Sequence, residues 1–286
     1  MSKIVFLNDT FVNESDAKIS VMDQGFLYGD GIYESFRSVN GTFPQFSKHY
    51  ERLTESAEAL NYEMKYSETE LIEILRMLQK KNKITHGYFR LTISRGNGVI
   101  GFERSFKNDL TYLILAKEYT GFSEDLYETG IELKVAETRR NAPEAISPKI
   151  KSISNLNSLL GKLEAKRLGV KEVIMLNNKD HICEGAASNI FWIKDKWVFT
   201  PDTSTGLLEG VTRSTIMDLC ERSLDLRVIT GEYKLQDLKF ADEVFITSTS
   251  LEVMPVVKVD NFTINDGKVG AKTKHLRKAL HTAMNY

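Results

Sequence analysis

The sequence predicts an α+β protein made of two domains. Runs with the two-residue period of strands alternate with runs that have the 3.6-residue period of helices in both halves of the chain. They do not form the regular strand–helix–strand series of a parallel sheet. A chain of 286 residues is long for one core and comfortable for two. Residues 119–129 are polar, contain Gly121 and lack a clear period. We therefore expect the domain boundary in this segment, with one domain at residues 1–121 and the other at residues 122–286.

The first half predicts strands at residues 4–7, 32–39, 88–94 and 111–116. Residues 47–60 are predicted to be helical, with Tyr50, Leu53 and Ala57 on one face. Ser67 and Glu70 have the spacing of a capping box, in which each side chain bonds the other residue's backbone amide. They therefore predict the start of a second helix.

The second half is predicted to open with a strand at residues 131–137, followed by a loop with two prolines. Residues 155–168 predict a helix that ends at Gly169, because glycine tolerates the left-handed conformation of a helix C-terminus. The further strands expected are 172–176, 190–193, 197–199 and 243–247, and the further helices are 211–224 and 270–284.

The composition excludes several classes of partner. The net charge is −1, from 38 Lys+Arg against 39 Asp+Glu, so there is no electrostatic case for nucleic acid or an anionic membrane. No apolar run approaches the roughly 20 residues of a spanning helix, and Asn8 and Asp9 interrupt the first apolar run too early for a signal peptide. Cys183 and Cys220 form no C-x-x-C pair and the histidines are scattered, so we expect a reduced cytoplasmic protein without a metal site.

Three features point to pyridoxal phosphate as a cofactor, and two of them are single residues. Lys151 follows a proline-bearing loop and precedes a small, polar run, and a lysine that forms a Schiff base has to be partly desolvated. Lys149 is the competing lysine, because both side chains point the same way in an extended segment. Glu184 precedes small residues that let a flat ring approach, and a carboxylate beside the pyridine nitrogen sustains the electron sink. A solvated loop carboxylate is the alternative for Glu184.

The third feature is a glycine-flanked turn entering a helix. Val211 and Thr212 open that helix, and a helix N-terminus offers free amides and a partial positive charge to phosphate; an ordinary turn capped by the threonine is the alternative. Arg52 is a candidate for the arginine that phosphate also favours. Residues 247–250 add hydroxyls at a strand end, where a simple turn is the alternative.

Residues 96–101 match the pattern G-x-G-x-x-G of dinucleotide sites. The chain before the next strand is too short for the crossover that such a site needs. We therefore expect a flexible glycine-rich loop at the mouth of the substrate site.

On these residues the chain resembles the class IV, or fold-type IV, pyridoxal-phosphate enzymes, which include branched-chain aminotransferases, D-amino acid aminotransferases and aminodeoxychorismate lyases. The family signature reads here as Glu184, Asn189-Ile190-Phe191, Val198-Phe199-Thr200 and Leu208-Glu209-Gly210-Val211-Thr212-Arg213. The resemblance covers nearly the whole chain. It implies a small N-terminal α/β domain, a larger C-terminal domain with a barrel-like β core, and a homodimer.

The resemblance also implies a role for each candidate residue. Lys151 holds the cofactor as an internal aldimine and transfers protons, which decides against Lys149. Glu184 pairs with the pyridine nitrogen. The residues implied for the phosphate are Arg52, Val211, Thr212 and Thr249, and those implied for the substrate are Tyr33, Tyr88, Arg90 and Ser250.

The expected reaction moves an amino group between an amino acid and a 2-oxo acid. Tyr88-x-Arg90 resembles the branched-chain enzymes, whereas Leu156 stands where those enzymes have a tyrosine. Residues 93–98, with 101–102, resemble the lyases, and the Arg-x-His pair of the D-amino acid enzymes is absent near residues 98–102. The alternative is therefore a lyase that gives 4-aminobenzoate and pyruvate from aminodeoxychorismate. A non-catalytic binding protein would need neither the lysine nor the carboxylate.

Overall fold

The computed structural model describes residues 3–101, 109–223 and 225–285, which form two compact units. The first unit comprises the described residues up to Thr120 together with Lys149–Ser154 and Asn285. The second comprises the described residues of Gly121–Pro148 and Asn155–Met284. Phe102, in the expected lyase-like pattern, and Leu224, the expected end of a helix, lie outside the described residues.

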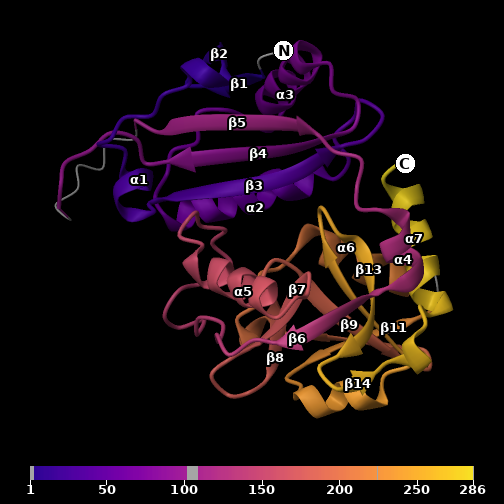
Figure 1. Ribbon diagram of the computed structural model, residues 1–286. Helices are drawn as coiled ribbons and strands as arrows, with labels where there is room; N and C mark the ends of the chain where they lie inside the picture. The colour runs from indigo at the N-terminus through magenta and orange to yellow at the C-terminus, as the bar shows by residue number, and fades with distance from the viewer. Residues whose placement is uncertain (1–2, 102–108, 224, 286) are drawn as a thin grey trace. The chain divides into compact units, whose positions relative to one another are not determined.

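The first unit is built on one antiparallel sheet with the strand order β2-β1-β5-β4-β3 (Figure 1). Its elements are β1 (Ile4–Leu7), β2 (Thr10–Asn13), α1 (Gln24–Tyr28), β3 (Gly31–Ser38), α2 (Phe46–Ala59), α3 (Glu68–Asn82), β4 (Gly87–Ser94) and β5 (Thr111–Glu118), with a 3₁₀ turn, η1 (Glu14–Asp16). The strands and helices predicted for this half are confirmed with ends shifted by one or two residues, and the predicted capping box at Ser67 is present. Strand β2 and helix α1 were not predicted, because runs of four and five residues carry little periodicity.

Alternation along β3 and β4 gives this sheet two different faces. Phe36 and Phe89 point into a core that α2 and α3 complete with residues such as Leu53 and Leu75. The residues that alternate with these along each strand, including Arg90, lie on the opposite face, since successive side chains of a strand point to opposite sides.

The second unit is built on a nine-stranded mixed sheet with the order β11-β10-β9-β12-β13-β6-β7-β8, in which β14 also pairs with β13. The strands are β6 (Ile131–Val135), β7 (Glu172–Leu176), β8 (Ile182–Gly185), β9 (Asn189–Lys194), β10 (Trp197–Pro201), β11 (Arg227–Gly231), β12 (Glu243–Ser248), β13 (Glu252–Val259) and β14 (Phe262–Thr263). The terminal strand β8 also lies against β9 and β10, so the sheet curls into a partial barrel. The expected α+β fold with a barrel-like β core is confirmed.

Helices pack against this sheet. They are α4 (Glu124–Thr129), α5 (Leu156–Arg167), α6 (Val211–Ser223) and α7 (Ala271–Ala283), with 3₁₀ turns η2 (Thr203–Thr205), η3 (Leu235–Phe240) and η4 (Asn265–Gly267). Helices α6 and α7 pack on one sheet face through Ile216 and Leu276, and α5 packs on β7 through Ala165. The segment 119–129 was expected to be irregular, but α4 forms there; six residues are too few to show a helical period. Within the described residues, no helix combines the length and apolar character needed to span a membrane.

Candidate active site

Lys151 lies on a short segment that pairs with the edge of β3 in the first unit. Its carbonyl accepts the amide of Tyr33 at 2.9 Å, and the amide of Ile153 donates to Gly31 at 2.9 Å. The Lys151 amide donates to Ser56 Oγ on α2 at 3.1 Å. These three bonds fix the backbone of Lys151 between a strand and a helix.

Two cationic side chains contact the aromatic ring of Tyr33. The Lys151 Nζ atom lies 4.6 Å from the ring centroid, and the Arg90 guanidinium carbon lies 3.8 Å from it. Lys149 is exposed, whereas Lys151 is half-buried against this ring. The structure therefore brings Lys151, Tyr33 and Arg90 together and distinguishes the two lysines by burial.

The face of β3 and β4 opposite the core, called the open face below, carries further basic and aromatic side chains. Tyr88 lies on this face, with the Lys117 Nζ atom 5.4 Å from its ring centroid. The Arg37 guanidinium lies 5.0 Å from the ring centroid of Tyr119, and Arg37 is buried. Sequence reasoning did not single out Arg37, although it lies four residues after Tyr33 on β3, two strand periods away, and therefore on the same face.

Arg52 is held by a buried carboxylate on β3. Its Nε and Nη2 atoms donate to the two oxygens of Glu34 at 2.7 and 2.8 Å, and His49 Nδ1 lies 2.7 Å from Glu34 Oε2. Burial raises the pKa of Glu34, but the Arg52 charge and the hydrogen bonds from His49 and Arg52 outweigh it and bring that pKa down to about 2. Burial lowers the pKa of His49 despite Glu34, so His49 is neutral at pH 7 and donates its Nδ1 proton. Glu34 and His49 were not identified from the sequence.

Glu184 is a buried carboxylate at the end of β8 in the second unit, not a solvated loop residue. Its Oε1 atom lies 2.6 Å from Arg140 Nη2. Its Oε2 atom accepts from Asn189 Nδ2 and from the Leu208 amide, both at 3.2 Å. Arg140 was not predicted as a site residue, because nothing local distinguishes it from its neighbour Arg139.

Val211 and Thr212 form the buried first turn of α6. Gly210 precedes them and has no side chain with which to cap the helix, and a Cβ atom there would lie 2.2 Å from Asn189 Oδ1. A buried helix N-terminus that its preceding residue cannot cap requires another partner for its amides, and an anion is a suitable one.

The turn after β12 contains Thr249 and Ser250, and it is held by a bond from the Leu251 amide to Ser248 Oγ at 3.1 Å. Just before it, Thr247 Oγ1 is buried and has no hydrogen-bond partner within the described part of the chain. Next to Glu184, burial raises the pKa of the Cys183 thiol to about 12, so this thiol is not a nucleophile at pH 7.

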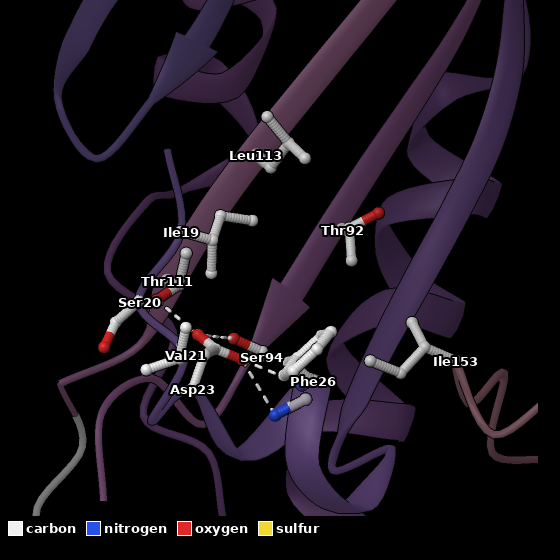
Figure 2. A pocket seen from close by; sticks show the side chains of 11 residues that line it. Ile19, Ser20, Val21, Asp23, Phe26, Thr92, Ser94, Thr111, Leu113 and Ile153 are labelled. Carbon is white, nitrogen blue, oxygen red and sulfur yellow. Dashed lines mark hydrogen bonds between the residues drawn. The ribbon is translucent and has the colours of Figure 1, made fainter. Parts of the chain in front are cut away.

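A pocket of about 310 Å³ opens on the first unit (Figure 2). It is lined by the apolar side chains of Ile19, Val21, Phe26, Leu113 and Ile153, and by Thr92 and Ser94 among others. Asp23, also in its wall, is fully used: it accepts the Gly25 and Phe26 amides and the hydroxyls of Ser94 and Thr111. None of the predicted site residues lines this pocket, whose apolar wall suits a hydrophobic group rather than an anion.

A comparison with protein families matches residues 31–259 of the chain to the family "Amino-transferase class IV". The chain is 34% identical to a putative branched-chain-amino-acid aminotransferase of Methanocaldococcus jannaschii, over 96% of this chain and 94% of that protein. It is 35% identical to a D-alanine aminotransferase of Staphylococcus epidermidis, over 96% of each. It is also 34% identical to an aminodeoxychorismate lyase of Bacillus subtilis, over 96% of this chain and 94% of that protein.

Solved structures agree with the sequence relatives. The branched-chain amino acid aminotransferase of Escherichia coli superposes with a TM-score of 0.94 at 30% identity, over 99% of this chain and 95% of that one. A second branched-chain amino acid aminotransferase, from T.th. and solved with pyridoxamine 5′-phosphate, superposes with a TM-score of 0.93 at 25% identity, over 100% and 95%. The matched segment, the identities and the shared fold together make this chain a member of the class IV aminotransferases, which are pyridoxal-phosphate enzymes.

Proposed function

We propose that the protein transfers the amino group of an amino acid with an acidic side chain to a 2-oxo acid, with Lys151 as the cofactor-binding lysine. The observation that carries this proposal is the ring of Tyr33, which contacts both the Lys151 amine and the Arg90 guanidinium. A carboxylate bound by Arg90 would therefore lie near the amine that exchanges protons.

The residues of the chain fit the three reactive parts of pyridoxal phosphate. Glu184 is a fixed anion for the protonated pyridine nitrogen, since Arg140 and Asn189 hold it in place. The first turn of α6, with Thr212, suits the phosphate because Gly210 cannot cap it, and Arg52 and Thr249 are proposed to bind the phosphate as well. Lys151 supplies the amine for the aldehyde. The bound cofactor supplies the electron sink for the reaction.

The chain's own residues then orient the substrate and move protons. The Nζ atom of Lys151 accepts the proton from the substrate α-carbon and later donates one back. Tyr33 limits the position of Nζ from one side, and Arg90, with Tyr88 beside it, binds the acidic side chain. Ser250 lies on a turn whose backbone amides suit the substrate α-carboxylate. Glu184 remains a carboxylate throughout, paired with Arg140.

The basic face of β3 and β4 supports an acidic donor such as glutamate. Arg37 and Arg90, with Lys117 on the neighbouring β5, place three cations there, each against an aromatic ring. A carboxylate gains charge-assisted hydrogen bonds from a guanidinium, whereas a purely aliphatic side chain gains nothing from it. Arg90 shares the open face of this sheet with Tyr33, whose ring also contacts the Lys151 amine, and this supports a place for Arg90 in the site.

Spectroscopy of the purified protein tests this reaction without any 2-oxo acid present. We expect L-glutamate to remove the visible absorbance of the bound cofactor and to produce a new near-ultraviolet band from pyridoxamine phosphate. D-alanine in the same experiment tests the alternative donor, a D-amino acid without an acidic side chain. An unchanged spectrum with both compounds contradicts the proposal and favours the lyase, which aminodeoxychorismate then tests by release of pyruvate.

We further propose a homodimer that works in the cytoplasm. Exposed hydrophobic side chains border the pocket of the first unit: Ile19, Val21 and Phe26 are 47%, 73% and 76% exposed. A patch of this kind supports coverage by a second copy. Cys183 and Cys220 are both free thiols, as in a reducing compartment.

Light scattering after size exclusion tests the dimer. The wild-type mass should equal two chains, and Phe26→Asp should shift it toward one. Phe240→Asp is the matched control, because Phe240 is 73% exposed but lies in the other unit. A single-chain mass for the wild type at micromolar concentration refutes the dimer.

A further inference from the structure

Glu172 is a buried carboxylate that takes no part in the site as described so far. It begins β7 and is 1% exposed. Its Oε1 atom accepts the amides of Val173 at 3.0 Å and Ala186 at 3.1 Å. Its Oε2 atom accepts the Ala187 amide at 3.3 Å and the Ser188 hydroxyl at 3.4 Å. Three of these four donors belong to one tight turn.

The turn held by Glu172 joins Glu184 to Asn189. Glu184 is the penultimate residue of β8, and Asn189 is the first residue of β9. Between them the Gly185 amide donates to the Ser188 carbonyl at 2.6 Å, and a Cβ atom on Gly185 would lie 2.2 Å from Ser188 Oγ. The backbone between the two side chains is therefore short and closely packed.

The consequence for Glu184 is geometric. Asn189 Nδ2 donates to Glu184 Oε2 at 3.2 Å and to the Leu208 carbonyl at 2.8 Å. Asn189 can make both bonds only while the turn presents it beside Glu184. Without the Glu172 acceptor, the buried Ala186 amide would lose its partner, and an unpaired buried donor destabilises the backbone that carries it. The turn would then relax and move Asn189 relative to Glu184.

A cation next to Glu172 supports an anionic acceptor. Lys162 Nζ on α5 lies 3.5 Å from Glu172 Oε2 and also donates to the Lys171 carbonyl at 2.7 Å. Helix α5 approaches the same turn closely, since a Cβ atom on Gly161 would lie 2.9 Å from the Ala186 Cβ atom. The turn is thus clamped by a carboxylate from β7 and by a helix surface.

We propose that Glu172 is a positioning residue, which acts on the cofactor through Glu184 by fixing the turn that presents Asn189. The inference rests on the proposed role of Glu184 at the pyridine nitrogen. A buried carboxylate orients its partners better than a neutral amide, because it forms stronger hydrogen bonds and only accepts them. In Glu172→Gln, the side-chain NH₂ group would replace one acceptor oxygen and would face the amide and hydroxyl donors of the turn.

A double-mutant cycle tests the inference with cofactor affinity as the readout. Apoprotein of the wild type, Glu172→Gln, Glu184→Gln and the double variant is titrated with pyridoxal phosphate, and the dissociation constant follows from the visible absorbance. Glu172→Gln should weaken binding about tenfold, the scale on which residues that orient a ligand-binding side chain act. In the Glu184→Gln background the same change should have less than about a twofold effect, because the residue through which it acts is gone.

The controls separate the possible failures. Glu132→Gln removes an exposed carboxylate of the same unit and should leave affinity unchanged. Equal losses from Glu172→Gln with and without Glu184 overturn the inference, because they assign Glu172 to the fold alone. Wild-type affinity in Glu184→Gln refutes instead the proposed role of Glu184. If Glu172→Gln does not fold, Ser188→Ala removes one donor of the same turn and has to show the same dependence on Glu184, in the same direction.

Discussion

The buried triad of Glu34, Arg52 and His49 makes a sharp prediction about stability. Glu34→Gln keeps the shape of the side chain but removes the charge that Arg52 and His49 face. The fall of the Glu34 pKa from 4.5 to about 2 corresponds to about 3 kcal/mol in the free energy of unfolding. Removing one partner of a buried ion pair costs about 3–5 kcal/mol by a separate line of reasoning, so the two magnitudes agree.

The pH dependence follows from the direction of the shift. Because the folded pKa lies below the ordinary value, the stabilisation by Glu34 is present above pH 4.5 and is lost as the pH falls toward 2. Urea unfolding at pH 7 should therefore show Glu34→Gln to be about 3 kcal/mol less stable than wild type, and the gap should narrow below pH 4.5 and close only as the pH falls through 2. Glu73→Gln on the exposed face of α3 is the control and should change stability by less than about 0.5 kcal/mol. A gap below about 1 kcal/mol at pH 7, or one independent of pH, refutes the reasoning.

Three further substitutions test the site. Lys151→Ala should reduce turnover by at least about 10²- to 10⁴-fold with an unchanged far-ultraviolet circular dichroism spectrum, whereas the exposed Lys149→Ala should be as active as wild type; the reverse result would exchange their roles. Glu184→Ala should keep the visible absorbance of the bound cofactor but slow turnover severely, and wild-type kinetics would remove it from the site. Arg140→Met leaves the Glu184 charge buried and should lower the free energy of unfolding by about 3 kcal/mol in urea, while Arg139→Met, whose partner Asp180 is 69% exposed, should cost at most about 1 kcal/mol; equal effects would contradict the distinction.

Local patterns were sufficient for the elements whose periodicity is long. Strand β3 alternates buried and half-buried residues over most of its length, and the capping box marked the start of α3. Strand β13 was missed because six of its eight residues are buried and Pro255 interrupts the run, which ordinarily argues against a central strand. Helix α4 and strand β8 are simply too short to carry a period.

The site divides in the same way between local and long-range information. Lys151 and Glu184 follow from short motifs, because their neighbours in the sequence are also part of their environment. Arg140 and Arg139 are adjacent and chemically identical, yet Arg140 is half-buried against Glu184 and Arg139 lies at the surface with Asp180. The Arg140 amide donates to the Leu176 carbonyl on β7, and this long-range pairing of the loop, which no local pattern encodes, fixes which arginine turns inward.

Three buried carboxylates recur beside the residues that we assign to the cofactor. Glu34 holds Arg52, Glu172 holds the turn after Glu184, and Glu184 itself is held by Arg140. Stability alone does not account for them, since well-packed hydrophobic side chains in place of a buried ion pair are often equally or more stable. Unlike a hydrophobic contact, a buried ion pair is directional, because each of its hydrogen bonds fixes the orientation of the partner group. The cost of burying these charges is therefore best understood as the cost of orienting the groups that bind pyridoxal phosphate.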